Sequence, residues 1–220
     1  MAVEAKPLRK ALGKRIPIVR IGVGPAAASR ATARVLEEHS PDYVIVAGIA
    51  GGVGRHLSIG DLVIPSEVVD DATGATYRPH PLPGLDPDGS LVTVDRLHDH
   101  ESLTNRHPGI DAVDMESAAT AACCAAAGVP WTAVRGISDL TWREPIDPES
   151  IRFLRPDGSI DLGGATRHVL RHPGALGGFV RIGNGTRSAM GAVTALLSDL
   201  LSDVQSGAVG TAPEEDTPQR

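Results

Sequence analysis

The sequence predicts an α/β fold built on a largely parallel sheet. Apolar runs that suit strands alternate along the chain with alanine-rich stretches that suit helices, and this alternation is typical of parallel sheets. The run Tyr43–Ala47 is continuously apolar, as expected of a strand buried on both faces. Glu116 opens a helical stretch and Asp139 follows an apolar strand. Such positions are typical of a ligand site in an open α/β sheet, so we expect both acids at one edge.

The N-terminal half is expected to alternate short elements. The pattern predicts a helix over 4–12, a strand over 16–23, a helix over 26–39, and strands over 43–47 and 62–64. A glycine-rich loop over 48–52 follows the apolar run. Residues 70–89 hold many Asp, Gly and Pro and suit an irregular surface loop.

The C-terminal half begins with a short strand over 91–94 and a polar connection over 96–109. A helix starts at Met115-Glu116, a turn follows at 128–130, and a strand over 131–134 leads to Ser138-Asp139. Loops are expected over 140–163, and helical stretches with Gly-Pro breaks over 165–204. We expect one domain over 1–204 and a disordered tail over 205–220.

Composition limits the classes of partner. The 220 residues are 41% apolar with a net charge of −6, which suits a single cored domain and gives no basic face for nucleic acid. The only lysines are Lys6, Lys10 and Lys14. Cys123 and Cys124 are adjacent and cannot join distant elements, so a reducing, cytoplasmic setting is expected. His98 and His100 have no third ligand in pattern, and neither a metal nor a cofactor is expected.

Two glycine segments could contact a ligand. The first, residues 23–29, ends an apolar run in Gly-x-Gly before a helix, where backbone N–H groups can meet an anion or a sugar oxygen. The second, residues 46–52, lets a ligand approach the backbone closely. A plain tight turn and simple packing explain the same glycines. Likewise, Glu116 could only complement a helix dipole, and Asp139 could only cap a helix.

The order of five motifs resembles a known family. GVG, AGIAGG, GDLVI, DMESAA and VRGISD follow one another as in the purine nucleoside phosphorylase and methylthioadenosine/S-adenosylhomocysteine nucleosidase superfamily, over about residues 1–142. This resemblance implies a three-layer α/β/α sandwich with a mixed central sheet, and a homodimer. It also implies cleavage of the N-glycosidic bond of a nucleoside, by phosphate or by water.

The resemblance also assigns roles to individual residues. It places Met115 under the ribose, and Glu116 as acceptor for the 2′ and 3′ hydroxyls. It makes Asp139 the general acid for purine N7, oriented by Ser138. Further residues expected to line the nucleoside are Gly24, Ile49, Gly51 and Val94.

Glu4 matches the glutamate that activates water in the nucleosidases of this family. In those proteins a strand precedes that glutamate, and this sequence begins within the turn after it. We therefore expect that the first strand is missing from the 220-residue chain, because of a late start.

The expected nucleophile is water. Phosphorylases of the family carry an arginine just before the Gly-Ser/Thr loop, but residues 44–47 hold none and Ile49 replaces the hydroxyl. Arg20 and Arg55 could supply the missing cation. The resemblance thus predicts hydrolysis of an adenine nucleoside such as 5′-methylthioadenosine or S-adenosylhomocysteine, with a phosphorylase as the first alternative.

Two further functions are compatible with the sequence. The C-terminal third resembles the hopanoid-associated phosphorylase subgroup, which implies adenosylhopane-type cleavage, and contact with a lipid or membrane only if the substrate is lipidic. Its basic residues alternate with apolar ones: Arg167, Arg171, Arg181 and Arg187. The other possible function is that of an inactive module that binds a nucleoside.

Overall fold

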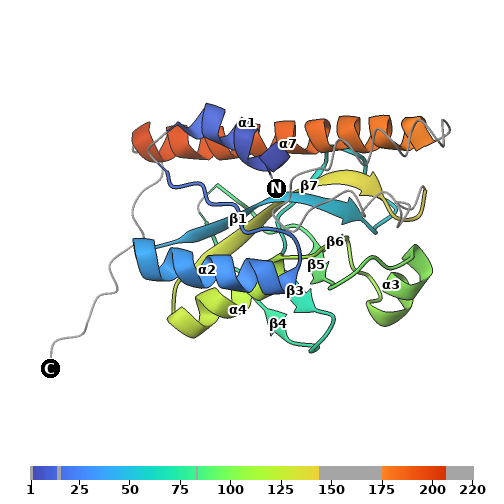
Figure 1. Ribbon diagram of the computed structural model, residues 1–220, viewed down its shortest axis with the longest axis horizontal. Coiled ribbons are helices and arrows are strands. Elements are labelled where there is room, and N and C mark those ends of the chain that lie inside the picture. Colours follow the sequence, from blue (N-terminus) through green and yellow to red (C-terminus); the bar gives the residue numbers. More distant parts are fainter. Residues whose placement is uncertain (1, 14–15, 83, 144–174, 207–220) are drawn as a thin grey trace, which may run out of the picture.

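A seven-stranded sheet with helices on both faces forms the centre of this computed structural model (Figure 1), which describes residues 2–13, 16–82, 84–143 and 175–206. The strand order is β2-β7-β1-β6-β5-β3-β4. In chain order the strands are β1 (Val44–Gly52), β2 (Leu62–Val63), β3 (Glu67–Asp70), β4 (Thr76–Tyr77), β5 (Ser90–Thr93), β6 (Ala112–Asp114) and β7 (Trp131–Leu140).

The sheet is mixed, as the resemblance implied. β1 pairs in parallel with β7, and β5 pairs in parallel with both β3 and β6. β6 runs antiparallel to β1, β2 antiparallel to β7, and β4 antiparallel to β3. Because β1 and β7 lie side by side for their full length, their ends present residues of both strands to one edge of the sheet.

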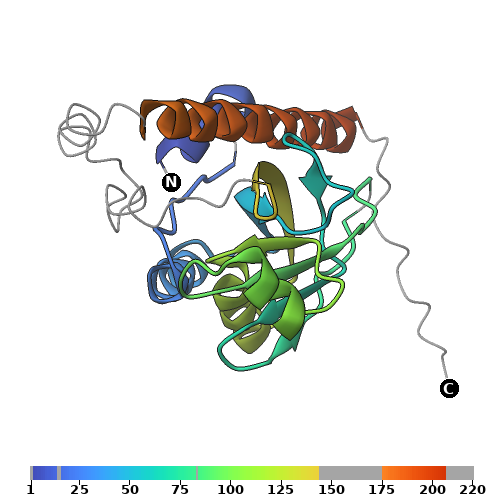
Figure 2. The ribbon, with the colours of Figure 1, turned by 90° about the vertical axis from the view of Figure 1, so that its right-hand side faces the viewer.

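Two helical layers enclose the sheet. α1 (Ala2–Leu12) lies beside α7 (Ala175–Ser206) on one face, and α2 (Pro25–His39) and α4 (Ser117–Ala127) cover the other (Figures 1 and 2). Under α1 and α7 the core contains Leu8, Met190 and Val193. The core on the α4 side is built from small residues such as Ala118 and Ala121. These layers confirm the three-layer sandwich. On the outer side of α1, Lys10 is exposed.

α7 touches β7 unusually closely. A side chain at Gly136 of β7 would meet the backbone of Ala189. A side chain at Gly185 of α7 would meet the carbonyl oxygen of Ser138. The two glycines therefore let the helix rest directly on the strand that carries Ser138 and Asp139.

Within the described part of the chain, none of the helices combines the length and hydropathy that a bilayer crossing needs.

Several sequence predictions need correction. Residues 16–23 are not a strand, and Gly22 within them adopts a φ of 86°, which a regular strand does not allow. The expected loop over 48–52 is instead the second half of β1, paired with β7 across a bulge between Ala50 and Gly51.

Some elements were missed altogether. The polar connection over 96–109 contains α3 (His100–Arg106), whose first turn is capped by the Asp99 side chain. β3, β4 and β6 were also missed. Over 175–204 the chain is one continuous helix, α7, while Pro173-Gly174, where a Gly-Pro break was expected, lies outside the described residues. The remainder of the expected helical region, over 165–174, and most of the loop over 140–163 lie outside the described residues, as does the tail from 207 onward.

Candidate active site

The second half of β1, residues 48–52, forms the floor of the candidate site. A side chain at Gly48 would overlap the Arg135 guanidinium and would come within 2.8 Å of Glu4 Oε1. At Gly51 it would lie 3.2 Å from Val113 and 3.3 Å from Asp139 Oδ2. The absence of side chains on these glycines therefore makes room for charged groups from α1 and β7 in the middle of the sheet.

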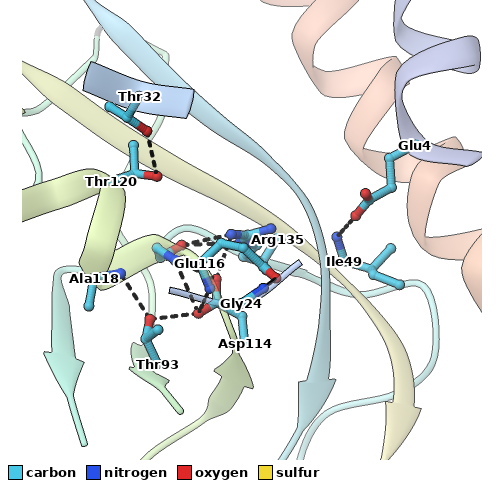
Figure 3. Close-up of polar contacts among 11 residues, drawn as sticks. Glu4, Gly24, Thr32, Ile49, Thr93, Asp114, Glu116, Ala118, Thr120 and Arg135 are labelled. Atoms are coloured by element: carbon cyan, nitrogen blue, oxygen red, sulfur yellow. Dashed lines mark hydrogen bonds and ion pairs between the residues drawn. The ribbon is translucent and has the colours of Figure 1, made fainter. Parts of the chain in front are cut away.

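Glu4 reaches this floor from the first turn of α1. Its side chain is buried, and Oε1 accepts a hydrogen bond of 3.1 Å from the backbone N–H of Ile49 (Figure 3). Leu8, one turn further along α1, packs into the core below α7 and fixes the helix against the sheet. The structure thus places the Glu4 carboxyl group against the backbone of β1, and Glu4 lies within α1 rather than just ahead of a helix.

Glu116 occupies the N-cap position of α4. Its Oε1 accepts a 2.9 Å hydrogen bond from the N–H of Gly24 (Figure 3), the residue before α2. The φ of 84° at Gly24 lies in the region that favours glycine, which explains the residue at this turn. The Gly-x-Gly turn and the helix-opening acid, expected separately from the sequence, therefore meet in space.

Burial raises the pKa of Glu116 to about 7, and the nearby Asp114 and Glu4 carboxyl groups contribute in the same direction. Arg135 and the Gly24 N–H act in the opposite direction. A carboxyl group with this pKa titrates near neutral pH. Its ionised form is a strong acceptor for two vicinal hydroxyl groups.

A buried network supports Glu116 from below. Arg135 on β7 is only 3% exposed and forms a 2.5 Å ion pair with Asp114 at the end of β6. Arg135 also donates to Ser117 Oγ through Nε at 3.2 Å and Nη2 at 2.9 Å. Thr93 Oγ1 donates a 2.6 Å hydrogen bond to Asp114, and Figure 3 shows the group around the start of α4.

Asp139 and Ser138 lie among the last residues of β7 rather than beyond its exit. Ser138 Oγ donates a 2.6 Å hydrogen bond to Asp139 Oδ1 and lies 3.3 Å from the Ala50 carbonyl oxygen. Burial raises the pKa of Asp139, although the Ser138 hydroxyl partly opposes this. A carboxyl group with a raised pKa retains its proton to higher pH, as a general acid requires.

The remaining expected site residues lie around this floor. Met115 packs against the cluster that contains Val53, Val92 and Val94. Val94 is 2% exposed, so its side chain is enclosed in this structure. The Ile49 side chain packs toward the core below α7, while its N–H serves Glu4. Gly51 lies between Asp139 and Val113, as described above.

Sequence reasoning missed Arg135 and Asp114 as members of the site. The available signal was a charged residue inside the otherwise apolar run 131–137, because a buried arginine needs a buried partner. Within the described residues, no group of three or more His, Cys, Asp or Glu is arranged to hold a metal ion. His98 and His100 point to different partners, Asp71 at 3.8 Å and Thr141 at 3.0 Å.

Comparison with known families matches the chain over residues 8–100 and 89–156 to the model of the phosphorylase superfamily. The chain belongs to this superfamily. Among its relatives, a 5′-methylthioadenosine/S-adenosylhomocysteine nucleosidase of Chromohalobacter salexigens is 32% identical over 164 residues, covering 60% of this chain and 70% of the relative. The nucleosidase of Geobacillus sp. strain WCH70 is 30% identical over 164 residues, covering 60% of this chain and 71% of the relative.

Solved structures of other proteins share the fold. The nucleosidase of Neisseria meningitidis in complex with methylthio-immucillin-A gives a TM-score of 0.66 at 19% identity, covering 92% of this chain and 96% of that one. Futalosine hydrolase of Helicobacter pylori gives 0.65 at 15% identity, covering 92% and 94%. Both confirm the α/β architecture expected from the sequence.

Proposed function

We propose that this protein is a nucleosidase that hydrolyses the N-glycosidic bond of 5′-methylthioadenosine or S-adenosylhomocysteine. The relatives from Chromohalobacter and Geobacillus are nucleosidases for these two substrates. The observation that carries the proposal is the set of three carboxyl groups at the glycine floor of β1. Glu4 contacts Ile49, Asp139 lies beside Gly51, and Glu116 is close enough to Glu4 for their charges to interact.

Each carboxyl group has a distinct task in this proposal. Asp139 donates its proton to purine N7, so that the base takes the electrons of the breaking C1′–N9 bond and leaves as neutral adenine rather than as an anion. Glu116 accepts hydrogen bonds from the ribose hydroxyls and stabilises positive charge that develops on the sugar. Glu4 removes a proton from the water whose oxygen attacks C1′. The products are free adenine and the 5′-substituted ribose.

Water is favoured over phosphate by the charges near β1. Residues 44–47 carry no arginine. Arg135 is a cation at the floor, but Asp114 and Ser117 already occupy its Nε and Nη2 groups. A phosphate dianion here would also lie beside Glu4, and like charges repel at such distances. A phosphorylase is therefore disfavoured.

The test is product analysis with and without inorganic phosphate. With 5′-methylthioadenosine, the expected products are adenine and free methylthioribose, at a rate independent of added phosphate. Strict phosphate dependence with a sugar 1-phosphate product would establish a phosphorylase instead. S-adenosylhomocysteine and futalosine should be assayed in parallel, because the relative values of kcat/KM identify the preferred 5′ substituent.

Assembly and location are further parts of this proposal. We infer a homodimer from the family resemblance alone, and sedimentation equilibrium would decide it. A cytoplasmic location is supported by Cys123 and Cys124, which are both free thiols. Cell fractionation with a tagged chain would test that location.

A further inference from the structure

Asp114 has no direct part in the proposed reaction, yet its carboxyl group is among the most enclosed acids in the described chain, with the residue 6% exposed. Oδ1 accepts from Thr93 Oγ1 at 2.6 Å, and Oδ2 pairs with Arg135 Nη2 at 2.5 Å. The N–H groups of Glu116 and Ser117 lie within 3.3 Å of its oxygens. One carboxyl group thus joins β5, β6, β7 and the start of α4.

These contacts determine how Arg135 is oriented. Its Nε and Nη2 are directed to Ser117 and Asp114, so the guanidinium plane is held from one side. The remaining Nη1 lies over Gly48, at the place where Glu4 Oε1 also lies. Asp114 therefore holds Arg135 with its Nη1 on the side of the carboxyl group proposed to activate water.

The same contacts also fix Glu116. Its backbone N–H lies 3.3 Å from Asp114 Oδ1, while its own carboxyl group reaches Gly24 at 2.9 Å. The start of α4 is further tied down because Thr93 Oγ1, which donates to Asp114, accepts from the Ala118 N–H at 2.9 Å. A loss of Asp114 would loosen both the arginine and the helix start.

We propose that Asp114 is a positioning residue of the reaction, which holds Arg135 toward Glu4 and Glu116 toward the ribose from a single carboxyl group. This inference rests on the proposed function. It differs from a purely structural role because it predicts a change in the charge environment of Glu116. The charged groups that act on Glu116 are Asp114 on β6, Arg135 on β7 and Glu4 on α1.

The first experiment compares Asp114→Asn with the wild type. Asparagine keeps the shape but removes the charge, so Arg135 loses its charged partner. We expect kcat to fall about 10- to 100-fold, because misplacing a reacting group by about 1 Å can cost on the order of 100-fold. The acid limb of the pH profile of kcat/KM should also move to lower pH, because one of the negative charges that raise the Glu116 pKa is gone.

Asp111→Asn is the matched control. Asp111 precedes the same strand β6, and its carboxyl group accepts from the Ser90 N–H at 2.8 Å and hydroxyl at 3.0 Å. Asp111 is partly buried, and its hydrogen bonds join the residue before β6 to the first residue of β5. They do not involve the start of α4. We expect some loss of stability, with kcat and the acid limb unchanged. An equal kinetic effect in both variants would overturn the proposal.

A double-mutant cycle tests whether Asp114 acts through Arg135. If it does, kcat of Asp114→Asn/Arg135→Gln should be close to that of Arg135→Gln alone. If the two losses in kcat multiply, Asp114 does not act through Arg135 and that part of the inference is wrong. Should Asp114→Asn fail to fold, Thr93→Val provides the milder change. It removes the 2.6 Å hydrogen bond to Asp114 and should shift kcat in the same direction.

A readout independent of activity separates this inference from the proposed function. Carboxyl ¹³C NMR of glutamate-labelled protein, with the Glu116 signal assigned through Glu116→Gln, gives the Glu116 pKa directly. It should be lower in Asp114→Asn than in the wild type. An inactive wild type with this shift would reject the nucleosidase but retain the link between Asp114 and Glu116. An active wild type without the shift would reject the inference alone.

Discussion

Asp139 and Glu116 are both acids whose pKa is raised by burial, but their neighbours suit them to different tasks. The neighbour of Asp139 is a hydroxyl group, Ser138 Oγ at 2.6 Å, which orients the carboxyl group without adding charge. Glu116 has two acids and one arginine in its surroundings. A proton on Asp139 therefore depends mainly on burial, whereas the state of Glu116 depends also on the charges around it.

The first prediction concerns Asp139. In Asp139→Asn the shape is retained but no proton can reach the leaving base, so kcat should fall by at least about 100-fold, within the range of general-acid contributions. Steady-state assays of adenine release would measure this, with circular dichroism to confirm an unchanged fold. A variant that keeps most of the wild-type kcat would remove Asp139 from the role of acid.

The second prediction concerns Glu116. If its carboxyl group binds the ribose hydroxyls, Glu116→Gln should discriminate less than the wild type between 5′-methylthioadenosine and its 2′-deoxy analogue. The ratio of kcat/KM for the two substrates measures this directly. An unchanged ratio would show that Glu116 has no contact with the 2′ hydroxyl.

For single residues, the sequence predicted the acidic side chains of the site better than the buried Arg135 and Asp114 that contact or support them. Glu4, Glu116 and Asp139 were identified from their motifs, and the structure places all three around the floor of β1. Arg135 and Asp114 were missed because their significance lies in a pairing between β6 and β7, and local sequence does not show which distant strands come together. Their roles, like those of the acids, remain predictions until activity is measured.

At the scale of whole elements, the contact between α7 and β7 controls where Asp139 lies. Gly185 faces the Ser138 carbonyl, and Gly136 faces Ala189. Any side chain at either glycine has to push the helix away from the strand. The end of β7 that carries Asp139 is therefore sensitive to a helix that supplies none of the proposed catalytic groups.

The third prediction compares two glycines on α7. Gly185→Ala should destabilise the fold and lower kcat, because its methyl group would overlap the Ser138 carbonyl. Gly183→Ala is the control, since a side chain there meets nothing within 4 Å. It should stabilise the protein by about 0.5–1 kcal/mol, as alanine does over glycine within a helix. Chemical unfolding and steady-state kinetics would measure both effects, and equal behaviour of the two variants would contradict the prediction.

The elements themselves were predictable where their pattern was local. α1, α2, β1, β2 and β5 begin close to their expected positions. Two errors concern glycine: residues 48–52 were expected to form a loop and are strand, while residues 16–23 were expected to form a strand and are not. Glycine is compatible with both strand and loop, and which of the two forms depends on whether a neighbouring strand pairs with the segment. β7 runs beside the first segment, whereas the second contains a Gly22 with positive φ.

For the whole molecule, the raised pKa of Glu116 makes stability depend on pH. Glu116 titrates near pH 7 in the folded protein, where its pKa is about 7, and has an ordinary pKa of 4.5. Between these values the folded protein binds a proton that the unfolded chain has released, so stability falls as pH rises and the full cost is present above about pH 7. The raised pKa of Asp139 acts in the same direction.

The fourth prediction follows from this sign. Urea unfolding should show the wild type losing stability relative to Glu116→Gln as pH rises from about 4.5 to about 7, by on the order of 1–3 kcal/mol after allowance for the partial exposure of Glu116. Below about pH 4.5 the difference between the two proteins should no longer change with pH. A difference in stability between the two proteins that stays constant across this pH range would mean that Glu116 has an ordinary pKa.

The positions of the three lysines allow selective chemical labelling of one part of the molecule. Lys6 and Lys10 lie on α1, and Lys14 follows that helix closely in the chain, so no lysine amine lies beyond the first fourteen residues. An amine-reactive fluorophore would therefore label the neighbourhood of α1 without any engineered cysteine. Since Glu4 is part of the same helix, emission from such a dye would report whether α1 lifts from the sheet or settles onto it when a nucleoside enters.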